Sequence, residues 1–473
     1  MQFPSHYPVT CHTDHVRPGS VFVAIRGFSH DGVQYIPHAI QLGATTIVIQ
    51  EDVVLSPDIQ TLILPNNITL QRVANTRLAL AQLSAQAAGY PARKLRILGV
   101  TGTKGKTTST FLLEHILKSA GYKTALLGTV KNSILNHDLG AGLTTQQPDY
   151  LHQFFALCVQ ADVDYVVMEV AAQGLSMHRV HGIQFDGVIF TNFSQEHGEF
   201  YDSLDAYFAA KCQLFELCKN DAPVIINADD DWGKKLLDQH PEWISFGLKN
   251  SALIKAEVIG AINNAIEMNV HNNNSIHHLI CSSLLGMFNV YNMLGVYALA
   301  IKLGISAEVI AHAFKTFTKV PGRLERYPLP NGGTCIIDYA HNPSSFESVL
   351  STLRQLTHKL IVVFGCGGDR DKTKRPTMGS IANKYADLVV LTSDNPRSED
   401  PAVIINEIMA GIAPESRHKI VTILDRKKAI EYAYAQSNEK AIIALLGKGP
   451  DEYQIVGNVK TRFSEAEIVQ EFR

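Results

Sequence analysis

The sequence lacks the features that would place it in a membrane or in an oxidising compartment. No run of about 18 apolar residues occurs, and the first residues have neither the basic nor the apolar region of a signal peptide. The seven cysteines are scattered from Cys11 to Cys366 without a CxxC pair, so neither a disulfide framework nor a zinc site is indicated. The formal net charge of −3 argues against broad binding to nucleic acid or to anionic membranes. We therefore expect a cytoplasmic protein with no nucleic-acid or membrane partner. We also expect a monomer, although none of these features specifies the oligomeric state.

The chain has 473 residues, which corresponds to about three domains at the usual ~150 residues each. Its content of 46% hydrophobic and 18% charged residues is typical of a globular protein with ample core. Short apolar runs alternate with helical patterns throughout the chain, which indicates an α/β fold. Pro91 and the pair Pro321-Gly322 interrupt this alternation. They divide the chain into three predicted domains, residues 1–91, 92–320 and 321–473.

Apolar runs bounded by polar residues predict buried strands. These strands cover residues 20–25, 44–49, 165–170, 187–191, 360–364, 388–392 and 441–445, with a helix at 35–42 and a polar hairpin or loop at 263–278. Glu169 and Asn192 stand at the ends of two predicted strands. Because ligands of open α/β sheets bind at the carboxyl ends of the strands, both side chains should face one site. Residues 365–368 do not complete a dinucleotide fingerprint, because Arg370 takes the place of its third glycine.

A glycine-rich loop follows the apolar run that begins at Ile97. Residues 102–108 read Gly-Thr-Lys-Gly-Lys-Thr-Thr, and a helical pattern comes next. A strand, a glycine loop and a helix in this order are typical of a phosphate site, because the loop and the helix N-terminus present backbone N–H groups. Lys106 would reach the β- and γ-phosphates, and the Thr107 hydroxyl would hold Mg²⁺. The strict pattern has glycine where this chain has Val100, so the loop is a shortened variant. A chance glycine turn is the alternative.

Nine motifs, taken in order, resemble those of the Mur ligase family. Together they span nearly the whole chain, although any one of them alone would be weak evidence. The motifs are residues 102–108, 169–170, 191–192 with His197, 207–211, 288–292, 321–325, 338–343, 365–371 and 394–397. The resemblance implies three α/β domains: an N-terminal domain that binds a UDP substrate, a central P-loop ATPase domain, and a C-terminal Rossmann-like domain that binds an amino acid.

The resemblance also implies a ligase that requires ATP and Mg²⁺ and acts in peptidoglycan precursor synthesis. The implied reaction adds meso-diaminopimelate to UDP-N-acetylmuramoyl-L-alanyl-D-glutamate through an acyl phosphate, so the partners are small molecules. Joining a carboxylate to an amine in water is uphill, which is why the carboxylate must be activated. Transfer of the phosphoryl group requires positive charge, which Lys106 and Mg²⁺ would supply. Oxygen ligands such as those of Glu169 and Thr107 suit Mg²⁺.

By the same resemblance, the catalytic residues are Lys106, Glu169, His197 and Lys211, and Lys211 becomes carbamylated. The carbamate would bind a second Mg²⁺ beside His197; the alternative is a lysine that pairs with a surface acid. The implied ATP-binding residues are Gly102, Thr103, Lys104, Gly105, Lys106, Thr107, Thr108, Asn292, Arg323 and Asp338, and the implied metal ligands are Thr107, Glu169, His197 and Lys211. Asn292 would read the adenine ring, with a helix N-cap or a core amide as the alternative.

The implied amino-acid site consists of Arg370, Asp394, Asn395, Pro396, Arg397, Gly447 and Asp451. Its arginines suit meso-diaminopimelate, because a guanidinium donates two hydrogen bonds to a carboxylate and L-lysine lacks the second carboxylate. The segment 394–397 would also form a turn after the strand at 388–392. The sequence therefore predicts a preference for diaminopimelate over lysine.

We call the UDP-linked substrate that bears the reacting carboxylate the carrier. The resemblance implies a carrier site made of Thr13, Thr144, Thr145 and Arg179, and in this region the chain departs from the family. The family's Asp-Ser-Arg is His12-Thr13-Asp14, and its Glu-Val-Ser-Ser-His is Glu-Val-Ala-Ala-Gln at residues 169–173. Met177 stands where the family has glutamine, and Asp451 is one methylene shorter than the family's glutamate. Two ligase hypotheses therefore stay open, one with the muramyl dipeptide and one with another carboxylate carrier.

Two alternatives come from other functional classes. A P-loop kinase or ATPase would release ADP without an amine, and a non-catalytic nucleotide-binding module would release none. The retention of Lys106, Glu169, His197 and Lys211 argues against the binding module.

Overall fold

The computed structural model describes residues 3–27, 30–194, 200–249, 252–260, 265–272, 275–281 and 283–472. The chain forms two compact units. The first comprises Met1–Glu257, Asn269–His278 and Tyr291–Phe314, and the second comprises Val258–Met268, Leu279–Val290 and Lys315–Arg473. Mainly parallel sheets covered by helices make up the chain, so the predicted α/β class is confirmed. Within the described ranges, no helix is long and apolar enough to span a membrane.

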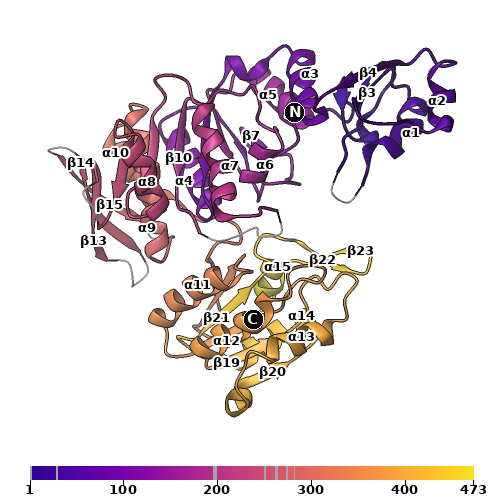
Figure 1. Ribbon diagram of the computed structural model, residues 1–473. Coiled ribbons are helices and arrows are strands. Elements are labelled where there is room, and N and C mark those ends of the chain that lie inside the picture. Colours follow the sequence, from indigo (N-terminus) through magenta and orange to yellow (C-terminus); the bar gives the residue numbers. More distant parts are fainter. Residues whose placement is uncertain are drawn as a thin grey trace. The chain divides into compact units, whose positions relative to one another are not determined.

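A small parallel sheet opens the first unit, in the order β1-β2-β3-β4 (Figure 1). Its elements are β1 (Val9–Thr10), η1 (Thr13–His15), β2 (Val21–Val23), η2 (Gly32–Tyr35), α1 (Ile36–Gln41), β3 (Thr46–Gln50), α2 (Pro57–Ile63), β4 (Thr69–Val73) and α3 (Thr76–Ala87). Phe22, Ile36 and Ile47 are buried together between the sheet and α1. The strands predicted at 20–25 and 44–49 and the helix predicted at 35–42 are confirmed.

A large sheet follows, with the strand order β15-β14-β13-β12-β11-β10-β5-β9-β6-β7-β8. Its strands are β5 (Arg96–Thr101), β6 (Thr124–Leu127), β7 (Asn132–Ile134), β8 (His137–Asp138), β9 (Tyr165–Glu169), β10 (Gly187–Phe190), β11 (Val224–Asn227), β12 (Ile244–Gly247), β13 (Ile254–Gly260), β14 (Ile266–Asn272) and β15 (Ser275–Cys281). Its helices are η3 (Pro91–Lys94), α4 (Lys106–Ser119), α5 (Pro148–Gln160), α6 (Ala172–Ser176), α7 (Leu204–Glu216), α8 (Asp231–Gln239), α9 (Met287–Lys302) and α10 (Ala307–Thr316). The polar segment at 263–278 contributes the adjacent strands β14 and β15.

At the centre of this sheet, β5 lies between β9 and β10 and runs parallel to both. Val100 pairs with Glu169, and Thr101 pairs with Phe190. Ile97, on β5, is fully buried, as the continuous apolar run predicts for a strand covered on both faces. The carboxyl ends of the three strands therefore meet at one edge, where the residues that follow them form a common site.

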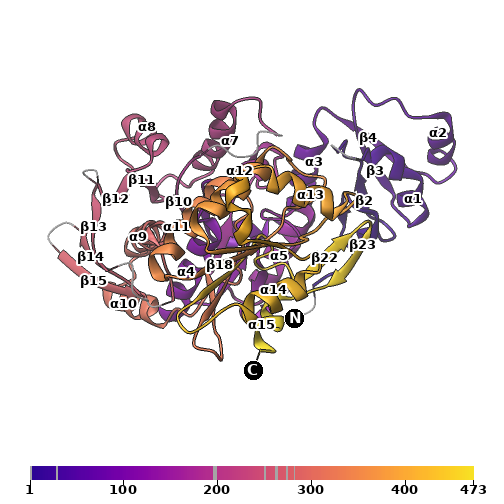
Figure 2. The same ribbon diagram turned by 90° about the horizontal axis from the view of Figure 1, so that it is seen from below.

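The second unit contains a six-stranded sheet in the order β16-β17-β21-β18-β19-β20, in which only β16 is antiparallel to its neighbour. Its elements are β16 (Glu325–Pro328), β17 (Thr334–Asp338), α11 (Pro343–Leu356), β18 (Leu360–Phe364), α12 (Lys374–Tyr385), β19 (Leu388–Leu391), α13 (Pro401–Met409), η4 (Pro414–Lys419), β20 (Ile420–Thr422), α14 (Arg426–Ala435), β21 (Ile442–Leu446), the hairpin β22 (Tyr453–Val456) and β23 (Val459–Arg462), and α15 (Glu465–Gln470). Helices α11–α13 cover one face of the sheet, and α14 and α15 cover the other (Figure 2).

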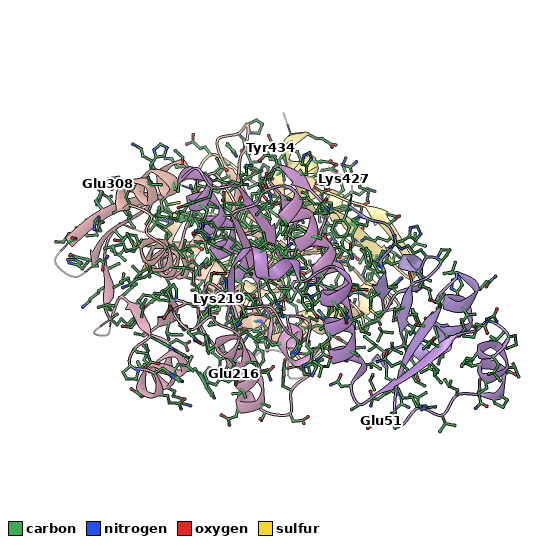
Figure 3. All side chains as sticks on the ribbon, turned by 90° about the horizontal axis from the view of Figure 1, so that it is seen from above. Glu51, Glu216, Lys219, Glu308, Lys427 and Tyr434 are labelled. Carbon is green, nitrogen blue, oxygen red and sulfur yellow. The ribbon has the colours of Figure 1, made fainter. Side chains whose placement is uncertain are left out.

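The carboxyl ends of these strands also converge. Asp338 on β17 and Phe364 on β18 both pair with Leu446 on β21. The loops after these strands therefore lie side by side at one edge of the sheet. Charged side chains such as Glu51, Glu308 and Lys427 are exposed on the outside of their domains (Figure 3).

Candidate active site

The loop that joins β5 to α4 is held by the two residues that follow β10. Thr103 N donates to Asn192 O at 2.8 Å, and Lys104 N donates to Asn192 Oδ1 at 3.0 Å. Thr191 Oγ1 donates to Lys104 O at 2.6 Å. Gly105 has a left-handed φ of +85° and leads directly into the first turn of α4. The neighbouring strand therefore fixes the loop, and the N-terminal N–H groups of α4 close it, which is the geometry that binds phosphate.

Lys106 is the first residue of α4, and its side chain folds back over the loop. Its Nζ donates to Gly102 O at 2.9 Å and to Thr103 O at 3.0 Å. The ammonium therefore stands beside the helix N-terminus, where it can meet the oxygens of a bound phosphate.

Glu169 presents its carboxylate to the same helix. Oε2 accepts a hydrogen bond from Thr107 Oγ1 at 3.1 Å, and Thr129 donates to both oxygens, from N at 2.8 Å and from Oγ1 at 3.1 Å. The Glu169 side chain is buried. A hydroxyl and a carboxylate in contact beside a phosphate loop form a donor set that suits Mg²⁺. Thr129 follows β6, and the sequence analysis did not single it out.

Lys211, on α7, is 1% exposed. Its Nζ donates to Gly102 O at 2.9 Å and lies 4.4 Å from the centre of the Tyr207 ring. The ammonium is thus buried against the phosphate loop and does not lie on the surface. His197 lies outside the described residues.

Asn292 is buried inside α9 rather than at its start, so the N-cap alternative is wrong. A Cβ added to Gly105 would lie 2.3 Å from Asn292 Oδ1. Only glycine therefore allows this amide to approach the phosphate loop so closely.

The predicted carrier residues of the large sheet surround the end of β9. Thr145 Oγ1 donates to Glu169 O at 3.0 Å, and Thr144 Oγ1 lies 3.0 Å from Thr129 Oγ1. Arg179 Nη1 donates to Thr145 O at 2.7 Å, and its Nη2 donates to the sulfur of Met177 at 3.3 Å. These contacts join the carrier residues to the end of the strand that carries Glu169.

Thr13 lies in η1, on the small sheet, where Asp14 N donates to His12 Nδ1 at 3.3 Å. The neighbouring Thr10 Oγ1 donates to Asp149 Oδ2 at 2.9 Å. The hydrogen bonds of this segment tie it to α5, and Cys11 also lies near enough to Arg179 for the guanidinium to favour a lower pKa of the Cys11 thiol, although burial and Asp149 raise that pKa overall.

In the second unit, the loops after β19 and β21 share a buried lysine. Lys448 Nζ donates to Asn395 Oδ1 at 3.1 Å and lies 3.8 Å from Asp394 Oδ1. Burial lowers the pKa of Lys448, and burial raises the pKa of Asp451 in the same segment. The sequence analysis selected Gly447 and Asp451 from the Gly-Lys-Gly segment and its continuation, and gave Lys448 no role of its own. Its signal was its place between them, directly after a predicted strand.

Arg397 and Arg370 come from different loops and meet over Gly367. A Cβ added to Gly367 would lie 3.1 Å from Arg397 Nη1 and 3.7 Å from Arg370 Cγ. Arg397 Nη1 donates to Gly368 O at 2.8 Å, and its backbone φ is +50°. The guanidinium of Arg397 and the aliphatic stem of Arg370 therefore both lie beside Gly367.

Arg375, which the sequence analysis did not select, supports this loop from within. It is fully buried and donates to Glu399 at 2.9 and 3.0 Å, to Glu407 Oε2 at 2.6 Å and to Gly367 O at 3.1 Å. Hydrogen bonds from Arg375 hold the pKa of Glu399 at about 2. Glu399 Oε1 also accepts from Asp369 N at 2.6 Å. The pair thus fixes the backbone on both sides of Gly368.

Asp338 faces backbone rather than solvent. Its carboxylate accepts from Leu324 N and Ala340 N, both at 2.7 Å, and burial raises its pKa. Arg323 lies with its guanidinium 4.9 Å from the centre of the Tyr339 ring. In this structure Asp338 therefore holds the turn that carries Arg323.

Family models match three separate parts of the chain. The family model "Mur ligase family, catalytic domain" matches residues 7–88, "Mur ligase middle domain" matches residues 100–300, and "Mur ligase, glutamate ligase domain" matches residues 322–449. In this order, the three matches fall on the small sheet, on the large sheet and on the six-stranded sheet.

Curated relatives and solved structures match over similar lengths. UDP-N-acetylmuramoyl-L-alanyl-D-glutamate--2,6-diaminopimelate ligase from Clostridium botulinum is 37% identical over 462 residues, 96% of this chain and 92% of that protein. The Aquifex aeolicus protein of the same name is 38% identical over 465 residues, 98% of this chain and 92% of its own. A solved structure of a ligase with this name has a TM-score of 0.66 at 26% identity and covers 98% of this chain and 94% of its own.

Proposed function

Because the chain belongs to the Mur ligase family, we propose that it joins meso-diaminopimelate to UDP-N-acetylmuramoyl-L-alanyl-D-glutamate at the expense of ATP. This reaction is a step of peptidoglycan precursor synthesis. One observation carries the proposal: Lys106 and Lys211 both donate to Gly102 O beside the hydrogen-bonded pair Thr107–Glu169. Two lysines, a hydroxyl and a carboxylate at a phosphate loop suit phosphoryl transfer to a carboxylate. The names of the curated relatives supply the two substrates.

The first half of the reaction takes place at the phosphate loop. Residues 102–108 hold the phosphates of ATP, and Asn292 contacts the adenine. The carrier's carboxylate oxygen attacks the γ-phosphorus, the bond from this phosphorus to the β–γ bridging oxygen breaks, and an acyl phosphate and ADP result. Lys106 stabilises the charge that develops on the transferred group. Arg323 and Asp338, in the second unit, are proposed as further ATP-binding residues on the resemblance to the family.

Mg²⁺ fits the donors Thr107 and Glu169, because hydroxyl and carboxylate oxygens are ligands that it prefers. Bound there, the ion would neutralise the charge of the phosphate oxygens. His197 and Lys211 are proposed as further ligands. Lys211 is proposed to react with CO₂, and its burial supports this, because a non-polar setting favours the uncharged amine that carbamylation requires.

The second half of the reaction uses the amino-acid site. The amine of diaminopimelate attacks the acyl carbon, the bond to the phosphate oxygen breaks, and the amide and inorganic phosphate form. Arg370 and Arg397 pair with the carboxylate that lysine lacks, which their approach over Gly367 supports. The other residues of this site are Asp394, Asn395, Pro396, Gly447 and Asp451.

Thr13, Thr144, Thr145 and Arg179 are proposed to bind the UDP-muramyl end. Residues 1–91 would form the carrier-binding domain, 92–320 the ATPase domain and 321–473 the amino-acid domain. We assign the reaction to the cytoplasm, where ATP and both substrates are available, and to a monomer.

The test is ADP release from purified protein with each substrate omitted in turn. Release that requires ATP, UDP-MurNAc-L-Ala-D-Glu and diaminopimelate together supports the proposal. Release without the amine would indicate a kinase or an ATPase. Release with a different carboxylate, in a panel of carriers, would support a family member with another carrier, which the departures at residues 12–14 and at Met177 favour as the second candidate.

A further inference from the structure

Lys448 stands in the proposed amino-acid site but cannot touch a substrate in this structure. Its side chain is 0% exposed, and its ammonium is enclosed by the rings of Tyr453 and Phe463, with centres 5.9 and 5.7 Å away. Its polar contacts are Asn395 Oδ1 at 3.1 Å and Asp394 Oδ1 at 3.8 Å. A buried cation is costly unless it is paired, so these contacts account for its place.

The contact with Lys448 fixes the orientation of the Asn395 amide. The atom of Asn395 that faces Lys448 Nζ also faces Ile455 N, at 3.0 Å. An ammonium and a backbone N–H can only donate, so this atom must be the acceptor oxygen. With both lone pairs of Oδ1 engaged, Nδ2 must point away from Lys448. Asn395 Nδ2 has no hydrogen-bond partner within the described part of the chain.

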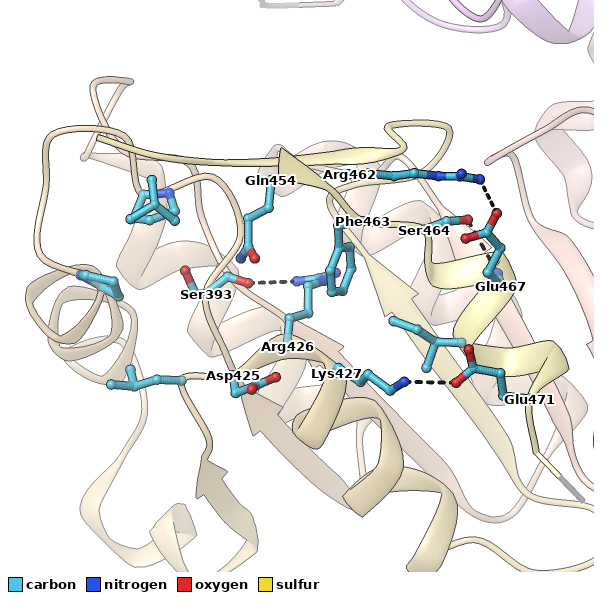
Figure 4. Close-up of a pocket in the computed structure, with 15 residues that line it drawn as sticks. Ser393, Asp425, Arg426, Lys427, Gln454, Arg462, Phe463, Ser464, Glu467 and Glu471 are labelled. Carbon is cyan, nitrogen blue, oxygen red and sulfur yellow. Dashed lines mark hydrogen bonds and ion pairs between the residues drawn. The ribbon is translucent and has the colours of Figure 1, made fainter. Parts of the chain in front are cut away.

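Neighbouring contacts hold the same arrangement in place. Arg426 is buried and donates to Glu465 Oε1 at 2.8 Å. It also donates to Leu446 O at 2.9 Å, at the end of β21, and to Ser393 O at 3.5 Å, shortly after β19. Gln454 Nε2 donates to Asp394 O at 2.8 Å. Arg426, Ser393 and Gln454 line a cavity of about 690 Å³ beside these loops (Figure 4). The frame around Asn395 is therefore rigid and polar.

We propose that Lys448 is a positioning residue that turns the Nδ2 donor of Asn395 toward a carboxylate oxygen of the amino-acid substrate. In this role Lys448 acts through Asn395 and makes no contact with the substrate itself. This inference rests on the proposed function of the site. It adds that recognition by Asn395 depends on the buried charge behind it, because without the ammonium only the Ile455 N–H still holds Oδ1, and the amide can turn its oxygen toward the substrate carboxylate at a lower cost.

The test is a double-mutant cycle with Lys448→Met and Asn395→Ala, measured as kcat/KM for diaminopimelate. We expect K448M to raise KM about 10- to 100-fold, the range for a lost hydrogen bond to a charged group, with a smaller change in kcat and an unchanged KM for ATP. In the N395A background the same change should have almost no further effect. If K448M raised KM equally in the wild type and in N395A, the proposal would be overturned, because Lys448 would then act independently of Asn395.

Two further variants keep the test decisive. Lys460→Met is the matched control, because Lys460 is exposed on β23 with its ammonium 3.7 Å from the centre of the Tyr453 ring, and it should behave like the wild type. Asn395→Asp keeps an acceptor for Lys448 and Ile455 but removes the donor, so its KM should rise as in N395A even if K448M does not fold. A wild-type KM in N395D would refute the donor role. If the wild type released no ADP in a diaminopimelate-dependent way, the proposed function itself would be refuted.

Discussion

Lys211 and Lys106 donate to one and the same carbonyl oxygen, that of Gly102, each at 2.9 Å. Two ammonium groups on one acceptor repel each other strongly where water is scarce. Conversion of Lys211 to a carbamate would replace this repulsion by attraction to Lys106 and to a bound Mg²⁺. The proposed carbamate of Lys211 would therefore lie beside Lys106 at the phosphate loop.

The first prediction concerns the phosphate loop. Lys106→Ala should lower kcat by about 10²-fold or more, because the substitution removes a cation from the developing phosphoryl charge. The melting temperature should stay close to that of the wild type, since the loop keeps its bonds to Asn192. Lys94→Ala, at an exposed lysine of η3, is the control. Near-normal turnover of K106A would remove Lys106 from the mechanism.

The second prediction concerns Lys211. Lys211→Ala should be nearly inactive, and short-chain carboxylates should restore part of the activity because they can replace the anionic end of a carbamate. Chloride at the same ionic strength should not restore it. Lys234→Ala, at an exposed lysine of α8, serves as the control. Full wild-type activity in CO₂-free buffer, with a bare amine in a high-resolution map, would contradict the carbamate.

The third prediction concerns the choice of amine. The wild type should use meso-diaminopimelate in preference to L-lysine. Arg397→Ala should lower the ratio of kcat/KM for meso-diaminopimelate to kcat/KM for L-lysine by about 10- to 100-fold. The reason is that a guanidinium paired with the distal carboxylate is lost, while lysine loses nothing. Arg417→Ala, at an exposed arginine of η4, should leave the ratio unchanged. Equal use of both amines by the wild type would refute this role of the arginines.

The fourth prediction concerns pH and the ion pair of Glu399 with Arg375. Arg375 lowers the pKa of Glu399 from 4.5 to about 2 in the folded protein. A carboxylate with a depressed folded pKa stabilises the fold fully above its unfolded pKa, and this contribution is lost as the pH falls toward the folded pKa. Glu399→Gln should therefore reduce the free energy of unfolding by about 1–3 kcal/mol at neutral pH.

The difference from the wild type should shrink between about pH 5 and about pH 2, and denaturant unfolding across this range measures it. Glu415→Gln, at an exposed carboxylate, is the control. A difference that is constant with pH would show that the pair contributes by packing and not by charge. The KM for diaminopimelate should also rise in E399Q, because Glu399 Oε1 holds Asp369 N beside Arg370.

The sequence predicts those parts of the site that a local pattern specifies. The phosphate loop, Glu169 and Asn192 follow from a strand–loop–helix pattern and from the ends of parallel strands, and the structure joins them as expected. Arg375 and Lys448 could not be predicted in this way, because their roles arise from partners 24 to 53 residues away that only the folded sheet brings into contact. A buried lysine and an exposed one look alike in a sequence.

The last prediction concerns the carrier, where the chain departs most from the family. At neutral pH, UDP-MurNAc-L-Ala-D-Glu should support turnover but bind about 10²-fold more weakly than in the family at large, because three or four hydrogen bonds of about 0.5–1.5 kcal/mol each are lost.

Met177 offers the most direct test, since its sulfur is a weak acceptor for Arg179 Nη2 at 3.3 Å. Met177→Gln should lower the Kd of the muramyl dipeptide by about 3- to 10-fold, because an amide can both hold Arg179 and donate to the substrate. Calorimetric titration of both proteins with UDP-MurNAc-L-Ala-D-Glu measures this, and Met409→Gln, in α13 of the second unit, is the control. Micromolar binding by the wild type with no gain in M177Q would mean that other residues compensate for the substitutions, and preferential turnover of another carboxylate would identify a different carrier.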